Sequence, residues 1–148
     1  MKKKLLVISW LFLLTTNQIA AQATVEKKQI APNFPEFKGV LLILKNDVLT
    51  SKIERKFEKS YKGKFQMVEE GELKTKQYND VKTYPFIVYC KFDGVTSSTT
   101  FYAFEMEDRT TGKTYRTARY PDNTIPPFHF ITKYIKALNK ARGESDGE

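Results

Sequence analysis

Alternating hydrophobic and polar residues between Tyr84 and Tyr120 predict three consecutive β-strands. The runs YPFIVYCKFDG, TFYAFEMED and KTYRTARY are separated by two polar segments, VTSST and RTTG, which are typical of turns. The three strands would therefore form an antiparallel meander. The third strand, residues 113–119, is polar on both faces, as expected of an edge strand that is protected by charge. The residues expected on the apolar core face are Phe86, Val88, Cys90 and Phe92 of the first strand and Tyr102, Phe104 and Met106 of the second.

A strand and a helix are predicted before the meander. The apolar run GVLLIL, residues 39–44, is bounded by glycine and polar residues and fits a buried strand. Apolar residues then recur every four positions from Leu49 to Phe57, with charged residues between them, which predicts an amphipathic helix. Asn46 or Asp47 would supply the N-cap of this helix.

The helix is expected to end at Gly63 as a C-cap, and a short strand, residues 65–68, follows. Strand, helix and strand within 30 residues predict a βαβ unit with parallel strands. A short helix is predicted within residues 71–82.

A final helix is predicted after a loop at residues 121–127. Its apolar stripe would contain Phe128, Ile131, Ile135 and Leu138, and its solvated face Lys133, Lys136 and Lys140. The complete order is β-α-β-(α)-β-β-β-α, which indicates an α+β (mixed α/β) fold with one mixed sheet covered by helices.

The first 23 residues have the pattern of a signal peptide. Lysines at positions 2–4 precede an apolar core at residues 5–14, and Ala21-Gln22-Ala23 fits a cleavage site. We expect an extended leader at residues 24–38, one domain at residues 39–142 and a disordered tail at residues 143–148. No cysteine lies near the cleavage site, so we expect an exported protein, periplasmic or extracellular, that is neither lipid-anchored nor membrane-spanning after cleavage.

The chain is basic, with a net charge of +8 that falls to +5 once the three lysines of residues 1–23 are removed. An exported basic protein can meet anionic polymers such as cell-wall or lipid phosphates, although such an excess also simply aids solubility. Cys90 is the only cysteine, so no intrachain disulfide can form. The sequence does not indicate an oligomeric state.

Candidate catalytic groups have simpler structural interpretations. His129 is the only histidine, and Cys90 falls on the apolar face of a strand, where burial keeps a thiol protonated. Glu105, Glu107 and Asp108 are expected to form cross-strand ion pairs with neighbours such as Lys91 and Arg116 rather than an acid–base site. No spacing suggests a metal site, a phosphate-binding loop or a cofactor, so we do not expect an enzyme.

One group of residues remains as a candidate binding surface. The second hairpin turn and the edge strand are basic and aromatic, a composition common at interfaces. We call this group the basic edge: Arg109, Lys113, Tyr115, Arg116, Arg119 and Tyr120. In an exported protein its partner would be an envelope protein or an anionic envelope polymer, not nucleic acid. The alternative is that these charges only protect the sheet edge.

The order of elements resembles small bacterial envelope domains, namely the N-terminal domain of TolB, CsgG and LpoB. The stretch TFYAFEMEDRTTGKTYRTAR, residues 100–119, resembles a strand of those families that ends in an Asp-x-x-Thr-Gly turn, and KFQMVEEGEL, residues 64–73, resembles their second strand. The chain departs from them in having no lipid-anchor cysteine, unlike CsgG and LpoB, and no β-propeller, unlike TolB. The resemblance implies a binding or assembly role in the envelope and assigns no functional residues.

The leading hypothesis is an exported, non-enzymatic interaction or assembly domain of the bacterial cell envelope. The second is a carrier of a small ligand or an anionic glycan, held in a cleft between the sheet and the final helix that Phe128, Tyr134 and Tyr102 would line. A hydrolase with an unrecognised site is the third.

Overall fold

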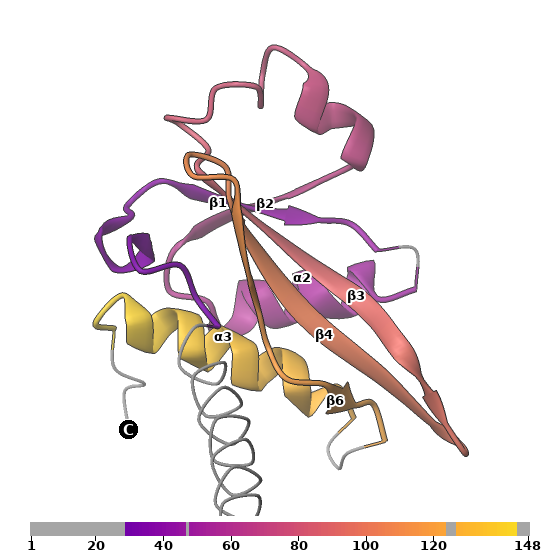
Figure 1. The fold of residues 1–148 in the computed structure, drawn as a ribbon. Helices are drawn as coiled ribbons and strands as arrows, with labels where there is room; N and C mark the ends of the chain where they lie inside the picture. The colour runs from indigo at the N-terminus through magenta and orange to yellow at the C-terminus, as the bar shows by residue number, and fades with distance from the viewer. Residues whose placement is uncertain (1–28, 47, 124–126, 145–148) are drawn as a thin grey trace, which may run out of the picture.

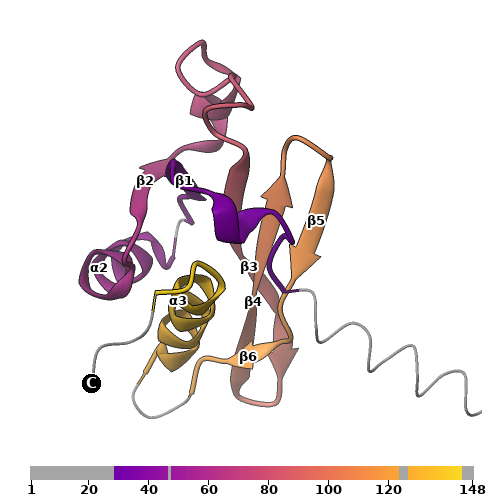
Figure 2. The same ribbon diagram turned by 90° about the vertical axis from the view of Figure 1, so that its left-hand side faces the viewer.

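The computed structural model describes residues 29–46, 48–123 and 127–144. The strands form one open mixed sheet in the order β2-β1-β3-β4-β5, with β6 paired to β4. The helices α2 and α3 lie side by side on one face of this sheet (Figure 1, Figure 2). The predicted α+β class is therefore confirmed. The elements in chain order are η1 (Phe34–Glu36), β1 (Val40–Leu44), α2 (Thr50–Ser60), β2 (Lys64–Val68), η2 (Glu70–Lys74), β3 (Phe86–Thr96), β4 (Thr99–Asp108), β5 (Lys113–Arg116), β6 (Tyr120–Pro121) and α3 (His129–Ala141), where η denotes a 3-10 helix.

The predicted βαβ unit is present. β1 pairs with β2 in parallel from Val40–Lys64 to Leu44–Val68, and α2 connects the two strands. On its other side β1 pairs in parallel with β3, but only at Leu42–Ile87 and Ile43–Val88. The sequence between β2 and β3 forms η2 in place of the short helix predicted within residues 71–82.

The helix α2 begins one turn later than predicted. A turn precedes it, in which the Oδ1 atom of Asn46 accepts hydrogen bonds from the backbone N–H groups of Val48 (3.0 Å) and Leu49 (3.1 Å). Asn46 thus caps this first turn with its side chain, as predicted, although α2 itself begins at Thr50 with Leu49 as the residue before it. Asp47, the other predicted cap, lies outside the described residues. The side chain of Asn46 also donates to the carbonyl oxygen of Cys90 (2.9 Å), which ties the start of the helix to β3.

Gly63 is not the C-cap that the sequence predicts. α2 ends at Ser60 with an extended Tyr61 as its C-cap, and Gly63 is not among the residues with positive φ. A Cβ atom at position 63 would lie 1.9 Å from Nη1 of Arg142 and 2.8 Å from Cζ of Tyr61. This glycine thus leaves room for the side chains of Arg142 and Tyr61 and does not form a left-handed turn.

The predicted meander is confirmed, with β3, β4 and β5 paired antiparallel in succession. β5 ends at Arg116, earlier than predicted. At the next residue the N–H of Phe104 donates to the side-chain Oγ1 of Thr117 (2.9 Å) and not to a backbone carbonyl, which interrupts the strand pairing. The segment after it is not entirely a loop either, since Tyr120 pairs with Tyr102 and Pro121 with Phe101 in the two-residue strand β6.

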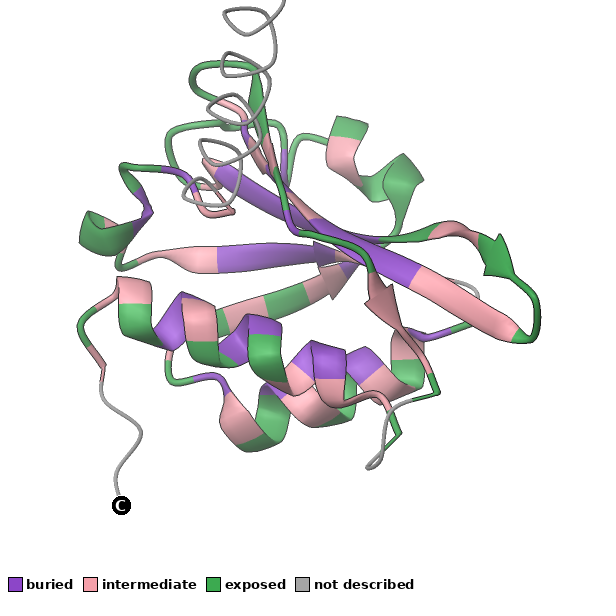
Figure 3. Ribbon diagram, turned by 60° about the horizontal axis from the view of Figure 1, so that its bottom comes forward, coloured by how far each residue is buried: buried purple, intermediate pink, exposed green. Residues whose placement is uncertain are grey.

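One core lies between the sheet and the two helices, as the burial colours of Figure 3 show. The apolar faces predicted for β3 and β4 point into it, with Phe86, Val88 and Cys90 buried beside Tyr102, Phe104 and Met106. Phe92 is the exception, because 61% of it is exposed. The β3–β4 hairpin is longer than the helical layer beneath it, so its far end projects from the molecule (Figure 1).

The predicted leader and tail also differ from the structure where they are described. Within the leader, residues 24–38, Ala31 and Phe34 are 1% and 0% exposed, and the ring of Phe34 packs edge-on against Phe86 at 5.4 Å. The described part of the leader, residues 29–38, therefore contributes to the core. At the other end, Glu144 pairs with Arg142 (3.3 Å) and its N–H donates to Asn139 (3.0 Å). The predicted signal peptide, residues 1–23, lies outside the described residues.

Candidate functional site

The face of the sheet turned away from the helices is covered at one end and exposed at the other. The covering segment is residues 69–85, whose Tyr78 is buried against Leu42, Val68 and Ile87 (Figure 1). Beyond it, the exposed end carries charged side chains of β3, β4 and β5 together with Arg119. Because the strands alternate, these side chains all point to the same side, away from the helices.

The charged side chains at this end form a continuous series of ion pairs, which we call the charge ladder. Lys91 pairs with Glu105 (2.6 Å), and Arg116 bridges Glu105 (3.6 Å) and Asp93 (2.6 Å). Arg119 pairs with Asp93 at 3.4 Å, and its guanidinium carbon lies 4.5 Å from the centre of the Phe101 ring. The predicted cross-strand ion pairs of Glu105 with Lys91 and Arg116 are thus confirmed.

Tyr89 and Glu107 extend this face toward the covered end. The hydroxyl of Tyr89 donates to Oε2 of Glu107 at 2.7 Å. Burial raises the pKa of Tyr89 well above its usual value, and the hydrogen bond to Glu107 raises it further. The tyrosine therefore remains protonated and acts as a hydrogen-bond donor, not as a base.

The structure separates the residues of the predicted basic edge. Arg116 and Arg119 come together in the charge ladder. Arg109 instead donates to the carbonyl oxygens of Tyr78 (2.8 Å) and Tyr84 (3.0 Å), which fastens residues 69–85 to the end of β4. Lys113 is exposed at the start of β5.

The two tyrosines of the basic edge lie on the opposite side of the sheet from the ladder. Tyr115 and Tyr120 are partly buried and pack against the core, where Tyr120 stacks on Phe130 at 6.1 Å. Two of the six residues therefore share one surface, and that surface also carries Asp93 and Glu105. An anionic ligand would have to compete with these two carboxylates for the arginines.

A second surface, which the sequence pattern did not reveal, lies along the projecting part of β3. β1 pairs with β3 only as far as Val88, so among the described residues the edge of β3 on this side has no neighbouring strand beyond that point. We use the name hairpin edge for this strand edge and the two exposed apolar residues of its strand, Phe92 (61%) and Val95 (58%). An unpaired strand edge with exposed apolar residues is a surface on which another chain can pair.

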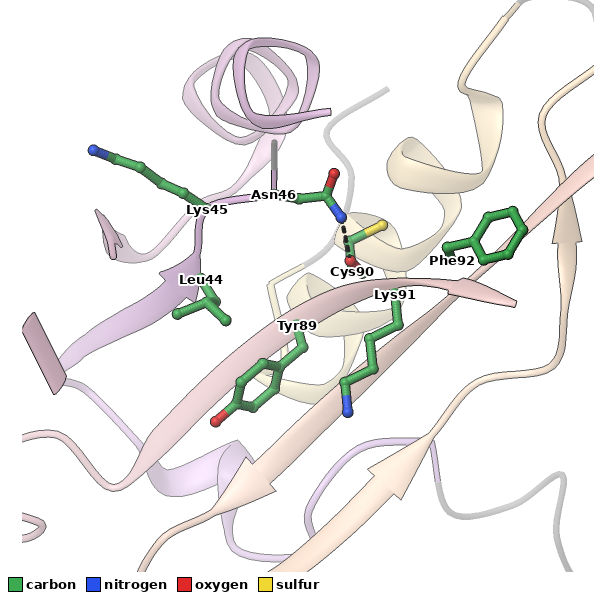
Figure 4. Close-up of a pocket in the computed structure, with 7 residues that line it drawn as sticks. All are labelled: Leu44, Lys45, Asn46, Tyr89, Cys90, Lys91 and Phe92. Atoms are coloured by element: carbon green, nitrogen blue, oxygen red, sulfur yellow. Dashed lines mark hydrogen bonds between the residues drawn. The ribbon is translucent and has the colours of Figure 1, made fainter. Parts of the chain in front are cut away.

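A pocket of about 370 Å³ lies at the base of the hairpin edge, where β1 ends and β3 continues (Figure 4). Its walls come from Leu44, Lys45 and Asn46 on one side and residues 89–92 on the other. This is the carboxyl end of β1 and the place where the chain order of the sheet reverses, a common position for ligands in sheets with parallel strands.

The cleft predicted between the sheet and the final helix is filled by aromatic rings. Tyr134 is 1% exposed and stacks on Phe104 with centroids 4.2 Å apart, and Tyr102 is 8% exposed and stacks on Phe130 at 5.5 Å. Burial raises the pKa of Tyr134 strongly. These rings form the core and leave no room between them for a ligand.

The remaining candidate groups have structural roles. Burial raises the pKa of Cys90 to about 12, so its thiol is protonated at neutral pH. Asp108 is 1% exposed and holds the β4–β5 turn, because its Oδ1 accepts hydrogen bonds from the N–H (2.9 Å) and hydroxyl (2.6 Å) of Thr110. Within residues 29–46, 48–123 and 127–144 no group of three or more His, Cys, Asp or Glu could hold a metal ion.

Across the same described ranges, no helix is both long and apolar enough to cross a membrane.

Comparison with known proteins gives few matches. No protein-family model and no curated protein matches the chain. Among solved structures, a PelC dodecamer from Paraburkholderia phytofirmans is similar with a TM-score of 0.40 and 8% identity, over 80% of this chain and 93% of that one. A PelC variant from the same organism gives a TM-score of 0.40 and 6% identity, over 72% and 89%. Similarity at this level carries no functional argument, and the resemblance to TolB, CsgG and LpoB stays a prediction.

Proposed function

We propose that this protein is an exported, non-enzymatic domain that binds a protein partner of the bacterial cell envelope. The predicted signal peptide supports the location, and the hairpin edge is the observation that carries the binding role. A partner segment in extended conformation would add a strand to the free edge of β3, in the way that β-augmentation extends other sheets. Its apolar side chains would cover Phe92 and Val95.

Two features of the hairpin edge favour strand addition. The carbonyl of Cys90 points away from β4, since it accepts from Asn46, and alternation directs the backbone N–H and C=O of Phe92 to the same free side. Phe92 is also braced, because its ring lies 6.4 Å from that of Tyr102 in an edge-on arrangement. The edge is therefore presented on an ordered strand.

Substitution of the exposed apolar residues tests this proposal. Phe92→Thr with Val95→Thr places β-branched residues, which favour strands, at both positions but removes the apolar surface. We expect partner affinity to fall at least about 10-fold, given about 1.5–3 kcal/mol per fully buried side chain. The measurement is affinity for a partner first identified by crosslinking in the native envelope. Val81→Thr, at an exposed valine outside the hairpin edge, is the matched control.

If the Phe92→Thr, Val95→Thr variant binds the partner as tightly as the Val81→Thr control, the hairpin edge is not the binding surface. If binding is lost instead in a variant with Arg116→Glu and Arg119→Glu, the contact lies on the basic edge that the sequence predicts.

The pocket at the end of β1 supports a second candidate, binding of a small ligand. Its volume of about 370 Å³ lies within the usual range for ligand sites. Asn46, Lys45 and Lys91 would provide polar groups for an anionic sugar or carboxylate, which would have to compete with Glu69 for Lys45 and with Glu105 for Lys91. A thermal-shift panel of anionic saccharides tests it. A ligand-induced rise in the melting temperature that disappears in Asn46→Ala would support this candidate. If no saccharide of the panel raises the melting temperature, the pocket is not a site for such ligands.

A further inference from the structure

The positive charge of this protein is concentrated in its helical layer, which we define as residues 50–62 and 127–144. These residues contain nine Lys and Arg against three Glu. The other described residues contain eleven Lys and Arg against ten Asp and Glu, so they are almost neutral. Nearly all of the excess positive charge of the described chain therefore lies on one of its two layers.

The two helices present this charge on one broad surface. They run in the same direction, because Lys52 lies over the Phe128 ring at their starts (5.7 Å) and Asn139 bonds the carbonyl oxygen of Ser60 (2.8 Å) and the N–H of Lys62 (3.1 Å) at their ends. The exposed cations of the layer are Arg55 and Lys59 of α2, Lys62 after it, and Lys133, Lys136 and Lys140 of α3. Those on the two helices lie opposite the buried residues of their helix, and therefore on the side turned away from the sheet.

The acidic residues of the layer lie to the side of this surface. Glu54 and Glu58 are four residues apart and share the flank of α2 opposite to Lys52, Lys56 and Lys59. Since Lys52 reaches toward α3, the glutamates lie on the flank away from α3. Glu144 is paired with Arg142 at the end of the layer. The area shared by the two helices is thus more basic than the count for the layer suggests.

We propose that the helical layer docks on the surface of a membrane that contains anionic lipids. A plane of negative charge fits a flat surface that displays cations from two parallel helices, and the near-neutral remainder of the molecule would be left facing the solvent. The exposed large apolar residues of the described chain, Val48, Val81, Phe92 and Val95, are all outside the layer. Docking would therefore be electrostatic, reversible and sensitive to salt, without insertion into the hydrocarbon region.

Vesicle sedimentation with two variants of equal charge tests this proposal. The exported form of the protein, after signal-peptide removal, is mixed with phosphatidylcholine vesicles with and without phosphatidylglycerol. The layer variant carries Lys59→Gln, Lys133→Gln and Lys140→Gln, and the control carries Lys74→Gln, Lys76→Gln and Lys82→Gln on the opposite side of the sheet. All six lysines are exposed, so both variants should fold, which circular dichroism checks.

We expect the wild-type protein to bind only vesicles with anionic lipid and to dissociate in 0.5 M salt, a condition that shortens the Debye length to about 4 Å. The layer variant should bind on the order of 100-fold more weakly, and the control within about 3-fold of the wild type. The Phe92→Thr, Val95→Thr protein should bind like the wild type, which separates this surface from the hairpin edge.

Equal losses in the two triple variants would overturn the proposal, because only net charge would then matter. Binding to dextran sulfate without binding to anionic vesicles would also overturn it, in favour of a soluble anionic polymer.

Discussion

Asp108 shows how a single buried carboxylate organises the second hairpin turn. It is the last residue of β4, and besides Thr110 it binds Nδ2 of Asn33 through Oδ2 (3.1 Å). Burial opposes ionisation of this carboxyl, but the hydrogen bonds from Thr110, Thr111 and Asn33 outweigh it and hold its pKa below the usual value. The contact with Asn33 also fastens the η1 segment to the sheet.

The ionised form of Asp108 should therefore stabilise the fold. With a lowered pKa in the folded state, its contribution is present above the unfolded pKa of about 4 and is lost as the pH falls through the folded value. We expect Asp108→Asn to lower the free energy of unfolding by about 1–3 kcal/mol at pH 7 and by less at pH 3. Urea denaturation at both pH values measures this, and equal losses at the two would contradict the assignment.

Gly63 is a residue-scale prediction of a different kind. A methyl group there would collide with Arg142, whose guanidinium lies over the Tyr61 ring at 5.6 Å and donates to its hydroxyl at 3.0 Å. We expect Gly63→Ala to lower the free energy of unfolding by about 1–3 kcal/mol. Gly71→Ala is the matched control, since a Cβ at position 71 meets nothing within 4 Å. Thermal unfolding of both variants is the measurement. A lower melting temperature in Gly63→Ala alone indicates that the contact with Arg142 matters, whereas equal changes in both variants would contradict this explanation.

The two residues differ in how far the sequence predicts them. Asp108 precedes Thr111, Gly112 and Lys113 in a turn that the sequence identifies, and Gly112 does adopt a positive φ of 68°. Gly63 follows an amphipathic helix, which favours a C-cap, but its contact with Arg142 joins residues 79 positions apart. No local pattern carries that information.

At the scale of elements, strand alternation in β3 predicts burial correctly up to Cys90 and wrongly at Phe92. Alternation tells which residues share a face, but it does not tell where the layer that covers that face ends. Tyr102, the neighbour of Phe92 on β4, is still covered by Phe130 of α3, whereas Phe92 itself is 61% exposed, so the cover ends between these two neighbours. The hairpin edge escaped the sequence-based prediction for this reason.

The buried position of Cys90 predicts its reactivity. With a pKa of about 12, the thiol should react with a disulfide reagent such as DTNB at least about 100-fold more slowly in the folded protein at pH 8 than in 6 M guanidinium chloride. A thiol as reactive in the native protein as in the denatured one would contradict the core packing of β3. The matched control is a free cysteine introduced at the exposed Ser98, which should react rapidly in both states.

At the scale of the whole molecule, the domain begins earlier than the sequence indicates. The prolines and scattered charges of residues 24–38 favour a leader, because no period marks Ala31 and Phe34 as core residues. Yet Phe34 is fully buried and contacts the rings of Phe37 (6.0 Å) and Phe86 (5.4 Å). Short irregular segments contribute single buried side chains to a core, and a single buried residue leaves no periodic pattern in the sequence.

We expect a chain that begins at Gly39 to be much less stable than one that begins at Gln29. Loss of Phe34 alone should cost about 3–5 kcal/mol, a large part of the stability of a domain of this size. Guanidinium denaturation of both chains and of full-length Phe34→Ala measures this. A chain beginning at Gly39 with undiminished stability would restore the boundary that the sequence predicts.

The charge distribution is also a property of the whole molecule. The sequence shows a basic total and predicts the basic edge, which includes Arg116 and Arg119, as a binding surface. The structure pairs these two arginines with Asp93 and Glu105 and leaves the excess on α2 and α3, with 68 residues between the end of one helix and the start of the next. Only the packing of the two helices against each other turns separate lysines into one surface.

The position of α3 in the core bears on when the chain can fold during synthesis. Phe130, Ile131, Tyr134, Ile135 and Leu138 all come from this helix, which follows every strand in the chain. Until residue 138 has left the ribosome, the apolar face of the sheet has no complete cover, and contacts of such long sequence separation form late. A chain that the sequence predicts to be exported would thereby stay unfolded until α3 has been synthesised, in the form that a protein-conducting channel accepts.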